Sequence, residues 1–368
     1  MSLLLILNIP PPYQGTTIMN QYLVDTLTEK NIDFIHLRIN SGADLKALGK
    51  LSCSKLMSAF NIVKKIFSLK REYQVAYLVM SVEGFAFYRH LFFILLLLVL
   101  KKTCILHLRG LGFRHKKGTA RLLTSFIFRK SYLVQHSALN SFDIENYTYK
   151  KLFYIPNGWP DYYYRHKEQV QGRFHSTSKE LNIIFLSNLM AGKGLFTVTD
   201  AILQICSAGD CKDLKIKWNF IGNWESESIR LQFYDFIESN RLQSSLGHVG
   251  PLYNDEKYSL LANMDILLFP TFYKHETWGN VILEAMMFKI PVIATRYVAI
   301  PEMVKHNKTG FLIETENTEE LVDKLKLLIS NPALRKRMGC EGRKWYLENF
   351  TSDIFKTNML HLFKTVSL

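Results

Sequence analysis

Two glutamates stand eight positions apart in the most informative stretch of the sequence. Glu276 comes just before residues 277–280, and Glu284 lies in the apolar run that follows them. One apolar run ends at residue 269, and another begins at residue 291. Strand, loop, helix and strand within about 30 residues form the crossover unit of a parallel sheet. The loop that carries Glu276 is therefore expected at the carboxyl edge of a strand, where such sheets bind ligands.

The spacing of the two glutamates fits a ligand that contains phosphate and sugar. A helix that begins near Gly279 and Asn280 points backbone N–H groups and a positive dipole end toward the ligand, and such a helix end binds phosphate. Glu276 before the helix and Glu284 one turn inside it can accept hydrogen bonds from sugar hydroxyls on either side of a diphosphate. A nucleotide sugar has this layout of ribose, two phosphates and hexose. The alternative is a buried α/β unit with two exposed glutamates.

The residues around the two glutamates resemble a known family signature. The matching residues are Glu276, Trp278-Gly279, Glu284-Ala285-Met286 and Pro291-Val292-Ile293-Ala294-Thr295. Together they resemble the E-x7-E signature of retaining glycosyltransferases of the GT-B fold, family 4 in particular. The resemblance is strong over residues 181–315 and looser over residues 1–160. It implies an α/β protein with two Rossmann-like doubly wound domains facing a cleft, and a nucleotide sugar (UDP-, GDP- or ADP-hexose) as donor.

Other residues of the second half resemble further elements of this family. Lys193, followed by glycine, matches the diphosphate clamp, which implies that its ammonium neutralises the departing diphosphate. Asn188 stands where the family commonly has arginine, so one cation of the expected pair is missing. Gly222 ends a strand whose loop lines the nucleotide base in relatives. Lys289 and Arg296 replace glycines of the family pattern, and the resemblance gives no account of either change.

In the first half, the resemblance indicates contacts with the donor sugar and the acceptor. Gly15 lies in the loop that approaches the diphosphate in relatives, where two glycines are usual. His107 or Arg109, at the carboxyl end of a strand, would touch the transferred sugar, and the sequence leaves open which of them does. Arg109 is also a candidate for binding the acceptor, and three basic residues that follow it closely are candidates for binding an acceptor pyrophosphate: Arg114, Lys116 and Lys117.

The sequence contains no Asp-x-Asp pair of the kind that holds a divalent ion on a diphosphate. The negative charges of the donor can instead be met by Lys193 and by the helix that begins near Gly279. The sequence therefore predicts a transferase that needs neither a divalent metal nor another cofactor.

The net charge of +14 comes entirely from the first half of the chain. Residues 1–180 hold 25 Lys and Arg against 11 Asp and Glu, whereas residues 181–368 hold 21 of each. A nucleic acid, an anionic membrane or an acidic substrate could explain this excess. The sequence shows no zinc-finger spacing, no RNP aromatic residues and no heptad-linked basic region, which argues against nucleic acid. Basic residues are interleaved with apolar runs at 62–71 and 91–102, which favours an anionic membrane surface over a merely basic, solvated one.

The apolar run at residues 91–100 is half as long as the about 20 residues that a membrane-spanning helix needs. It is therefore predicted to be a buried or interfacial helix. Residues 2–8 are predicted to form a first strand and not a signal peptide. The five cysteines show neither metal-binding spacing nor a disulfide framework. These features predict a cytoplasmic protein that is peripheral on the inner face of the cytoplasmic membrane.

Strands alternate with helices in both halves, as in doubly wound domains. Residues 1–170 are predicted to form a basic, membrane-facing acceptor domain, and residues 180–350 a nucleotide-sugar domain. The resemblance implies that a final helix, 351–368, returns to the first domain. Residues 162–178 are predicted to be an irregular linker. The predicted strands are 3–7, 34–37, 75–80, 103–108, 131–135, 151–155, 181–186, 216–221, 245–249, 266–269, 292–294 and 310–313.

The leading functional prediction is a retaining hexosyltransferase that acts on a lipid-linked saccharide in the biosynthesis of O-antigen, capsule or exopolysaccharide. A GT-B epimerase and a transferase with a soluble acceptor are alternatives within enzymes. A catalytically silent subunit that only binds a nucleotide sugar is the alternative outside them, and the asparagine at position 188 supports it.

Overall fold

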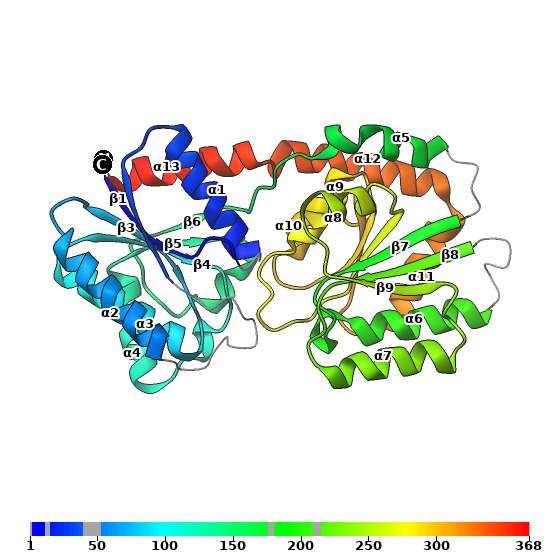
Figure 1. The fold of residues 1–368 in the computed structure, drawn as a ribbon, viewed down its shortest axis with the longest axis horizontal. Helices are drawn as coiled ribbons and strands as arrows, with labels where there is room; N and C mark the ends of the chain where they lie inside the picture. The colour runs from blue at the N-terminus through cyan, green and yellow to red at the C-terminus, as the bar shows by residue number, and fades with distance from the viewer. Residues whose placement is uncertain (1, 12–14, 40–52, 176–179, 209–214, 368) are drawn as a thin grey trace. The chain divides into compact units, whose positions relative to one another are not determined.

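The computed structural model describes residues 2–11, 15–39, 53–175, 180–208 and 215–367 (Figure 1). They divide into two compact units. The first unit comprises Met1–Gly158 and Ser352–Leu368, and the second comprises Trp159–Thr351. Each unit contains one six-stranded sheet whose strands all run parallel. All twelve predicted strands are present, with ends within one residue of the prediction. The predicted fold class, two Rossmann-like domains, is confirmed.

The sheet of the first unit has the order β2-β1-β3-β4-β5-β6. Its strands are β1 (Leu3–Leu7), β2 (Phe34–Arg38), β3 (Val75–Met80), β4 (Thr103–Leu108), β5 (Tyr132–Gln135) and β6 (Lys151–Tyr154). Its helices are α1 (Gly15–Glu29), α2 (Cys53–Ser68), α3 (Gly84–Val99), α4 (Gly118–Arg129) and α13 (Ser352–Ser367), with 3-10 turns η2 (Phe113–His115) and η3 (Ala138–Asp143). Helices α1 and α13 pack together on one face of the sheet, and α2, α3 and α4 form a layer on the other (Figure 1).

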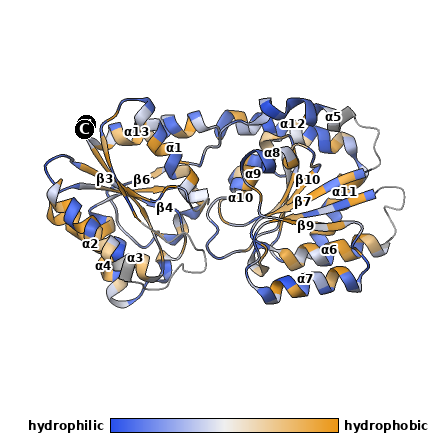
Figure 2. Ribbon diagram, viewed as in Figure 1, coloured by the Kyte–Doolittle hydropathy of each residue, from blue (hydrophilic) through white to orange (hydrophobic). Residues whose placement is uncertain are grey.

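The sheet of the second unit has the order β12-β11-β10-β7-β8-β9. Its strands are β7 (Glu180–Leu186), β8 (Lys215–Ile221), β9 (Leu246–Gly250), β10 (Ile266–Phe269), β11 (Val292–Thr295) and β12 (Gly310–Ile313). Its helices are α5 (Lys167–His175), α6 (Leu195–Ala208), α7 (Glu227–Ser239), α8 (Asn254–Leu261), α9 (Asn280–Met287), α10 (Ile300–Met303), α11 (Thr318–Ser330) and α12 (Pro332–Asn349), with 3-10 turns η4 (Tyr163–His166) and η5 (Ala191–Lys193). Hydrophobic residues follow the strands of both sheets (Figure 2).

The apolar run at residues 91–100 belongs to α3. Phe93, Ile94 and Leu97 are fully buried against the sheet of the first unit, whereas Phe92 and Val99 are exposed. A helix with one buried and one exposed apolar face agrees with the prediction of a buried or interfacial helix. Within the described ranges, none of the helices is both long enough and apolar enough to cross a membrane.

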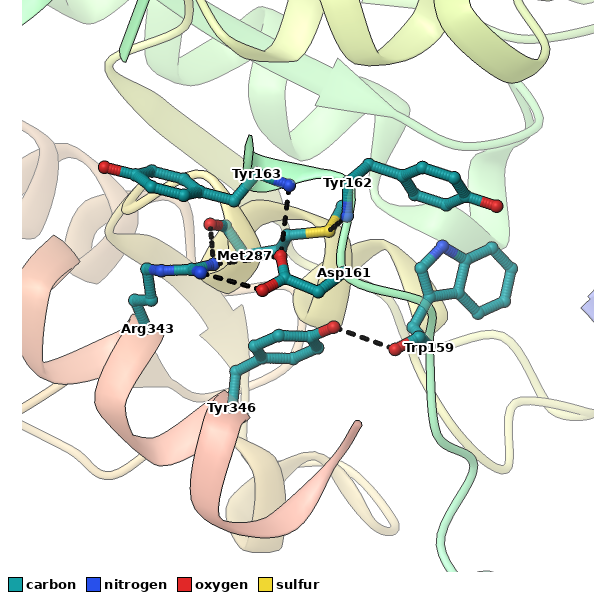
Figure 3. A network of polar contacts seen from close by, with 7 residues as sticks. All are labelled: Trp159, Asp161, Tyr162, Tyr163, Met287, Arg343 and Tyr346. Carbon is teal, nitrogen blue, oxygen red and sulfur yellow. Dashed lines mark hydrogen bonds and ion pairs between the residues drawn. The ribbon is translucent and has the colours of Figure 1, made fainter. Parts of the chain in front are cut away.

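The prediction that residues 162–178 form an irregular linker is wrong for the part that the structure describes, because η4 and α5 lie there. Residues 176–178 lie outside the described residues. Arg343 on α12 donates to both carboxylate oxygens of Asp161, at 3.2 and 2.8 Å, and to the Met287 carbonyl at 2.8 Å (Figure 3). Its guanidinium also lies 3.8 Å from the centroid of the Tyr163 ring. A single buried arginine thus ties the start of this segment to α9 and α12, which no local sequence pattern signals.

Helix α12 approaches the end of α9 closely because it has a glycine at the contact. A Cβ placed on Gly339 would lie 1.9 Å from the Lys289 carbonyl oxygen, so the two backbones meet where a side chain would otherwise be. Gly172 on α5 is the opposite case, because a Cβ there would have no neighbour within 4 Å.

Gly339→Ala is expected to lower the free energy of unfolding by about 1–3 kcal/mol, because α12 must move away from Lys289. Gly172→Ala is the control, and it is expected to raise stability by up to about 1 kcal/mol because alanine favours an exposed helix. Urea unfolding of the full chain measures both changes. Equal stability of the two variants would show that the backbones do not touch.

Three histidines are buried in the first unit. His90, His107 and His136 are 4%, 0% and 2% exposed. Burial lowers the pKa of His90 to about 3, with a contribution from the neighbouring Arg89 charge. Burial and the nearby Arg109 charge lower the pKa of His136 to about 3 as well. The same two causes, together with His136, lower the pKa of His107 well below 6.5. All three are therefore neutral in the folded unit at pH 7.

The free energy of unfolding of the first unit is expected to fall as the pH drops below about 6.5, because the three histidines bind protons in the unfolded state but stay neutral in the folded state. Each buried histidine contributes a loss of up to about 1.4 kcal/mol per pH unit. Urea unfolding at pH 7, 6 and 5 measures this slope. His90→Asn should lower this slope by the contribution of one histidine, up to about 1.4 kcal/mol per pH unit. An unchanged slope in that variant would contradict the neutral, buried state of His90.

Candidate active site

Loops from three neighbouring strands of the second unit form the candidate active site. Strands β10, β7 and β8 are adjacent and parallel, so their carboxyl ends lie at one edge of the sheet. Two glycines let the loops approach each other. Gly194 has φ +82°, and a Cβ on it would lie 2.3 Å from the Pro270 carbonyl oxygen. Gly222 has φ +149°, and a Cβ on it would lie 1.8 Å from the Ser187 carbonyl oxygen. Only glycine fits either position.

Glu276 and Lys193 form a buried ion pair at this edge. The Lys193 Nζ lies 2.6 Å from Glu276 Oε2, and the two side chains are 14% and 9% exposed. The Thr271 hydroxyl donates to the same carboxylate oxygen at 3.5 Å. The Lys193 ammonium also lies 5.0 Å from the centroid of the Tyr273 ring. Within the described residues, Glu276 Oε1 makes no hydrogen bond, so this oxygen is left to accept one from a ligand.

Glu284 forms a second and more deeply buried ion pair. The Lys257 Nζ on α8 lies 2.5 Å from Glu284 Oε1 on α9, and the side chains are 15% and 3% exposed. The part of the chain that the structure describes supplies no hydrogen bond to Glu284 Oε2. Lys257 is not among the site residues predicted from the sequence, because it follows Asp255 and Glu256 in a stretch typical of a solvated helix. No local signal could have found it, since only the packing of α8 beside α9 brings the two charges together.

Helix α9 begins at Asn280 with Gly279 as its N-cap residue, as predicted. A Cβ on Gly279 would lie 2.9 Å from a Phe269 ring carbon and 3.0 Å from Ile282 Cδ1. Glycine therefore lets the start of α9 pack closely against the end of β10. The first backbone N–H groups of a helix have no partner within it and favour anions. The buried carboxylate of Glu276 thus precedes the start of α9, and the buried carboxylate of Glu284 lies one turn into the helix.

The loop of β8 forms a neighbouring part of the same edge. The backbone N–H of Leu189 donates to the Asn223 carbonyl at 2.8 Å, so the loops of β7 and β8 run together. The Gly222 carbonyl lies 3.0 Å from His248 Nε2, and the His248 ring lies 4.7 Å from that of Trp224. Asn188 is exposed in this region. The structure thus groups Asn188 and Gly222, whereas their contacts with a donor stay predictions.

In the first unit, His107 is enclosed instead of facing solvent. Its Nδ1 lies 2.6 Å from the Tyr77 hydroxyl, its ring lies 5.3 Å from that of His136, and its exposed fraction is zero. A contact between His107 and a sugar would require the side chain to become accessible. Arg109 is half-buried and donates from Nη1 to the Thr16 carbonyl at 3.2 Å, beside Gly15 at the start of α1. Of the two residues between which the sequence left the choice, Arg109 is the more accessible.

The three basic residues predicted to bind an acceptor differ in their surroundings. The Asp143 carboxylate accepts hydrogen bonds from the backbone N–H groups of residues 112–114 and so holds this loop in place. Lys116 donates to the Val82 carbonyl, and partial burial lowers its pKa. Arg114 and Lys117 are exposed. Arg114 and Lys117 are therefore accessible to a ligand, whereas Lys116 is engaged in a hydrogen bond within the unit.

Nothing in the described ranges gathers three or more His, Cys, Asp or Glu side chains in a way that could hold a metal ion.

Comparison with known proteins identifies the domain that contains both ion pairs. The family model described as glycosyl transferases group 1 matches residues 167–345. The capsular polysaccharide biosynthesis glycosyltransferase CapM of Staphylococcus aureus is 27% identical over 199 residues, which are 54% of this chain and 50% of that protein. The N-acetyl-alpha-D-glucosaminyl L-malate synthase of Bacillus anthracis is 28% identical over 192 residues, 52% of this chain and 47% of that protein. The chain spans about half the length of these curated relatives.

Solved structures match over nearly the whole chain. Anabaena HepE in complex with UDP has a TM-score of 0.77 at 15% sequence identity, covering 99% of this chain and 100% of that one. WaaG, a glycosyltransferase involved in lipopolysaccharide biosynthesis, has a TM-score of 0.66 at 13% identity, covering 97% of this chain and 98% of that one. At such low identity these matches establish the fold alone. Residues 167–345 therefore match the glycosyl transferases group 1 model, and the chain has the GT-B fold.

Proposed function

We propose that this protein is a retaining glycosyltransferase that moves a hexose from a nucleotide sugar to a lipid-linked saccharide in cell-surface polysaccharide biosynthesis. The observation that carries the proposal is the pair of buried carboxylates, Glu276 and Glu284, on either side of the start of α9. They lie within the glycosyltransferase group 1 domain. Similarity to CapM, whose name states a role in capsular polysaccharide biosynthesis, supports the class of product.

The proposed donor site assigns a role to each group around α9. The backbone N–H groups at Gly279 and Asn280 bind the diphosphate. Glu276 Oε1 accepts hydrogen bonds from the hexose, and Glu284 Oε2 accepts one from the ribose. Lys193, already beside Glu276 at 2.6 Å, neutralises the leaving diphosphate, which itself takes the proton of the acceptor hydroxyl. The structures of HepE in complex with UDP and with UDP-glucose support a nucleotide-sugar donor.

We propose that this transfer needs no divalent metal. The leaving diphosphate develops negative charge, which a metal ion neutralises in many transferases. Here Lys193 and the start of α9 are placed to do the same work.

The proposed acceptor is lipid-linked because three neighbouring helices of the first unit expose apolar side chains beside basic ones. We call this the α2–α4 surface. Its exposed apolar residues are Met57, Phe60, Phe67, Tyr88, Phe92, Val99, Leu122, Leu123 and Phe126. Its exposed basic residues include Lys64, Lys65, Arg121 and Arg129. Aromatic and aliphatic side chains bordered by cations favour an anionic lipid surface. We therefore place the protein on the inner, anionic face of the cytoplasmic membrane.

Glu276→Gln is expected to cut transfer by at least about 100-fold, because one preorganised contact with the sugar is lost. Calorimetry against UDP-, GDP- and ADP-hexoses first identifies the donor. Release of nucleoside diphosphate in the presence of a lipid extract then measures turnover, with and without EDTA. Glu256→Gln, an exposed glutamate on α8, is the matched control and should keep wild-type activity.

Each outcome of that experiment decides between functions. Failure to bind any activated sugar, or full activity of Glu276→Gln, would refute the proposed site. Donor binding without turnover would favour a catalytically silent subunit. Turnover with soluble sugars alone would favour a soluble acceptor, and isomerisation of the donor an epimerase. Loss of activity in EDTA would contradict metal independence.

The protein is expected to sediment with vesicles that contain phosphatidylglycerol at low salt, and not with vesicles of phosphatidylcholine alone. Phe60→Ser/Phe126→Ser should weaken this binding by at least about 10-fold, because each buried Phe contributes roughly 1.5–3 kcal/mol. Leu231→Ser is the control, since Leu231 is equally apolar and 51% exposed but lies on α7 in the second unit. Equal binding to both kinds of vesicle, or no effect of the double substitution, would refute the α2–α4 surface.

A further inference from the structure

Lys257 is the partner of the more deeply buried of the two carboxylates. Its ammonium lies 2.5 Å from Glu284 Oε1, and its side chain is 15% exposed, whereas the neighbouring Asp255 and Glu256 on α8 are exposed. We infer that Lys257 is a positioning residue for nucleotide-sugar binding, one that holds the Glu284 carboxylate so that Oε2 accepts a hydrogen bond from the ribose. This inference rests on the proposed function.

Aromatic rings hold the Lys257 ammonium where it is. It lies 5.0 Å from the centroid of the Tyr258 ring and 5.7 Å from that of the Trp159 ring, within the range of cation–π attraction. The Trp159 indole N–H donates to the Tyr258 hydroxyl at 3.1 Å, and the Tyr162 ring stacks on Tyr258 with centroids 4.3 Å apart. The Tyr346 hydroxyl on α12 donates to the Trp159 carbonyl at 2.8 Å (Figure 3). Three segments of the second unit thus support one ammonium.

This arrangement is poorly explained by stability alone. Taking two charges out of water costs several kcal/mol each, and a buried ion pair can often be replaced by apolar residues without loss of stability. The Glu284 side chain, at 3% exposure, lies among buried apolar residues of α9. The role assigned here to the Glu284 carboxylate is therefore to bind a ligand, and Lys257 offsets the cost of burying its charge.

The two lysines differ in what they can do when a diphosphate arrives. Lys193 lies in the loop of β7 beside the start of α9, so its ammonium can turn from Glu276 to a phosphate oxygen. Both ammonium groups lie 5.0 to 5.7 Å from two aromatic rings, but Lys257 comes from helix α8 and not from a loop. Because helices are less mobile than loops, the Lys257 ammonium stays on Glu284. Glu284 thereby keeps one oxygen occupied and one directed at a ligand. A carboxylate fixed in this way distinguishes ribose from 2′-deoxyribose better than a mobile one.

Binding of UDP, GDP or ADP, whichever the chain prefers, and of the matching 2′-deoxy nucleotide tests the inference by calorimetry. Lys257→Met is expected to weaken binding about 10-fold, the scale of one charge-assisted hydrogen bond, and to reduce the preference for ribose. Lys257→Arg should restore both. In a Glu284→Gln background, Lys257→Met should change neither, because Lys257 acts only through Glu284. The Lys257→Met/Glu284→Gln chain has no unpaired buried charge and remains testable if Lys257→Met alone does not fold.

The outcomes separate the inference from the function on which it rests. If Glu284→Gln weakens binding and Lys257→Met does not, the role of Lys257 is wrong while the donor site stands. An equal loss from Lys257→Met in the Glu284→Gln background would make Lys257 a purely structural residue. If the chain binds no nucleotide, or Glu284→Gln binds as the wild type does, the proposed donor site fails and the role of Lys257 with it.

Discussion

A carboxylate kept almost out of water needs a cation or several hydrogen-bond donors beside it, and the second unit supplies a cation to two such carboxylates of the candidate site. Glu276 is paired with Lys193 and Glu284 with Lys257, each through a single oxygen. The start of α9 lies between the two pairs along the chain. The other features of the site follow from this need, because both lysines come from loops or helices that must be brought to α9 and held there.

Close backbone contacts hold the loops and helices of the site in position around α9. Gly194 and Gly222 remove the Cβ atoms that would hold the loops of β7, β10 and β8 apart, and Gly279 lets α9 start directly against β10. At the other end of α9, Gly339 lets α12 rest on the Lys289 carbonyl. Helix α9 is therefore fixed at both ends. A site that relies on short hydrogen bonds needs such a rigid support, since small displacements of a contact cost much of its energy.

The first unit differs from the second in where its charged side chains lie. Its three buried histidines are neutral at pH 7, and α2, α3 and α4 carry cations and apolar side chains on their exposed sides. The loop at residues 112–114 is fixed by Asp143, which leaves Arg114 exposed. The first unit thus displays many of its cations at the surface, whereas the second unit encloses ion pairs, among them Glu276–Lys193, Glu284–Lys257 and Asp161–Arg343.

The sequence by itself determined where the strands lie and which carboxylates flank α9. Apolar runs such as those of β1 and β10 are local patterns, so their ends could be predicted closely. The Glu276–Glu284 spacing and Gly279 are local as well. Tertiary structure alone decided what pairs with each carboxylate. Lys193 is 83 positions from Glu276, and Lys257 is 27 positions from Glu284. Such partners become neighbours only when β7 pairs with β10 and α8 packs near α9, and no spacing along the chain records that packing.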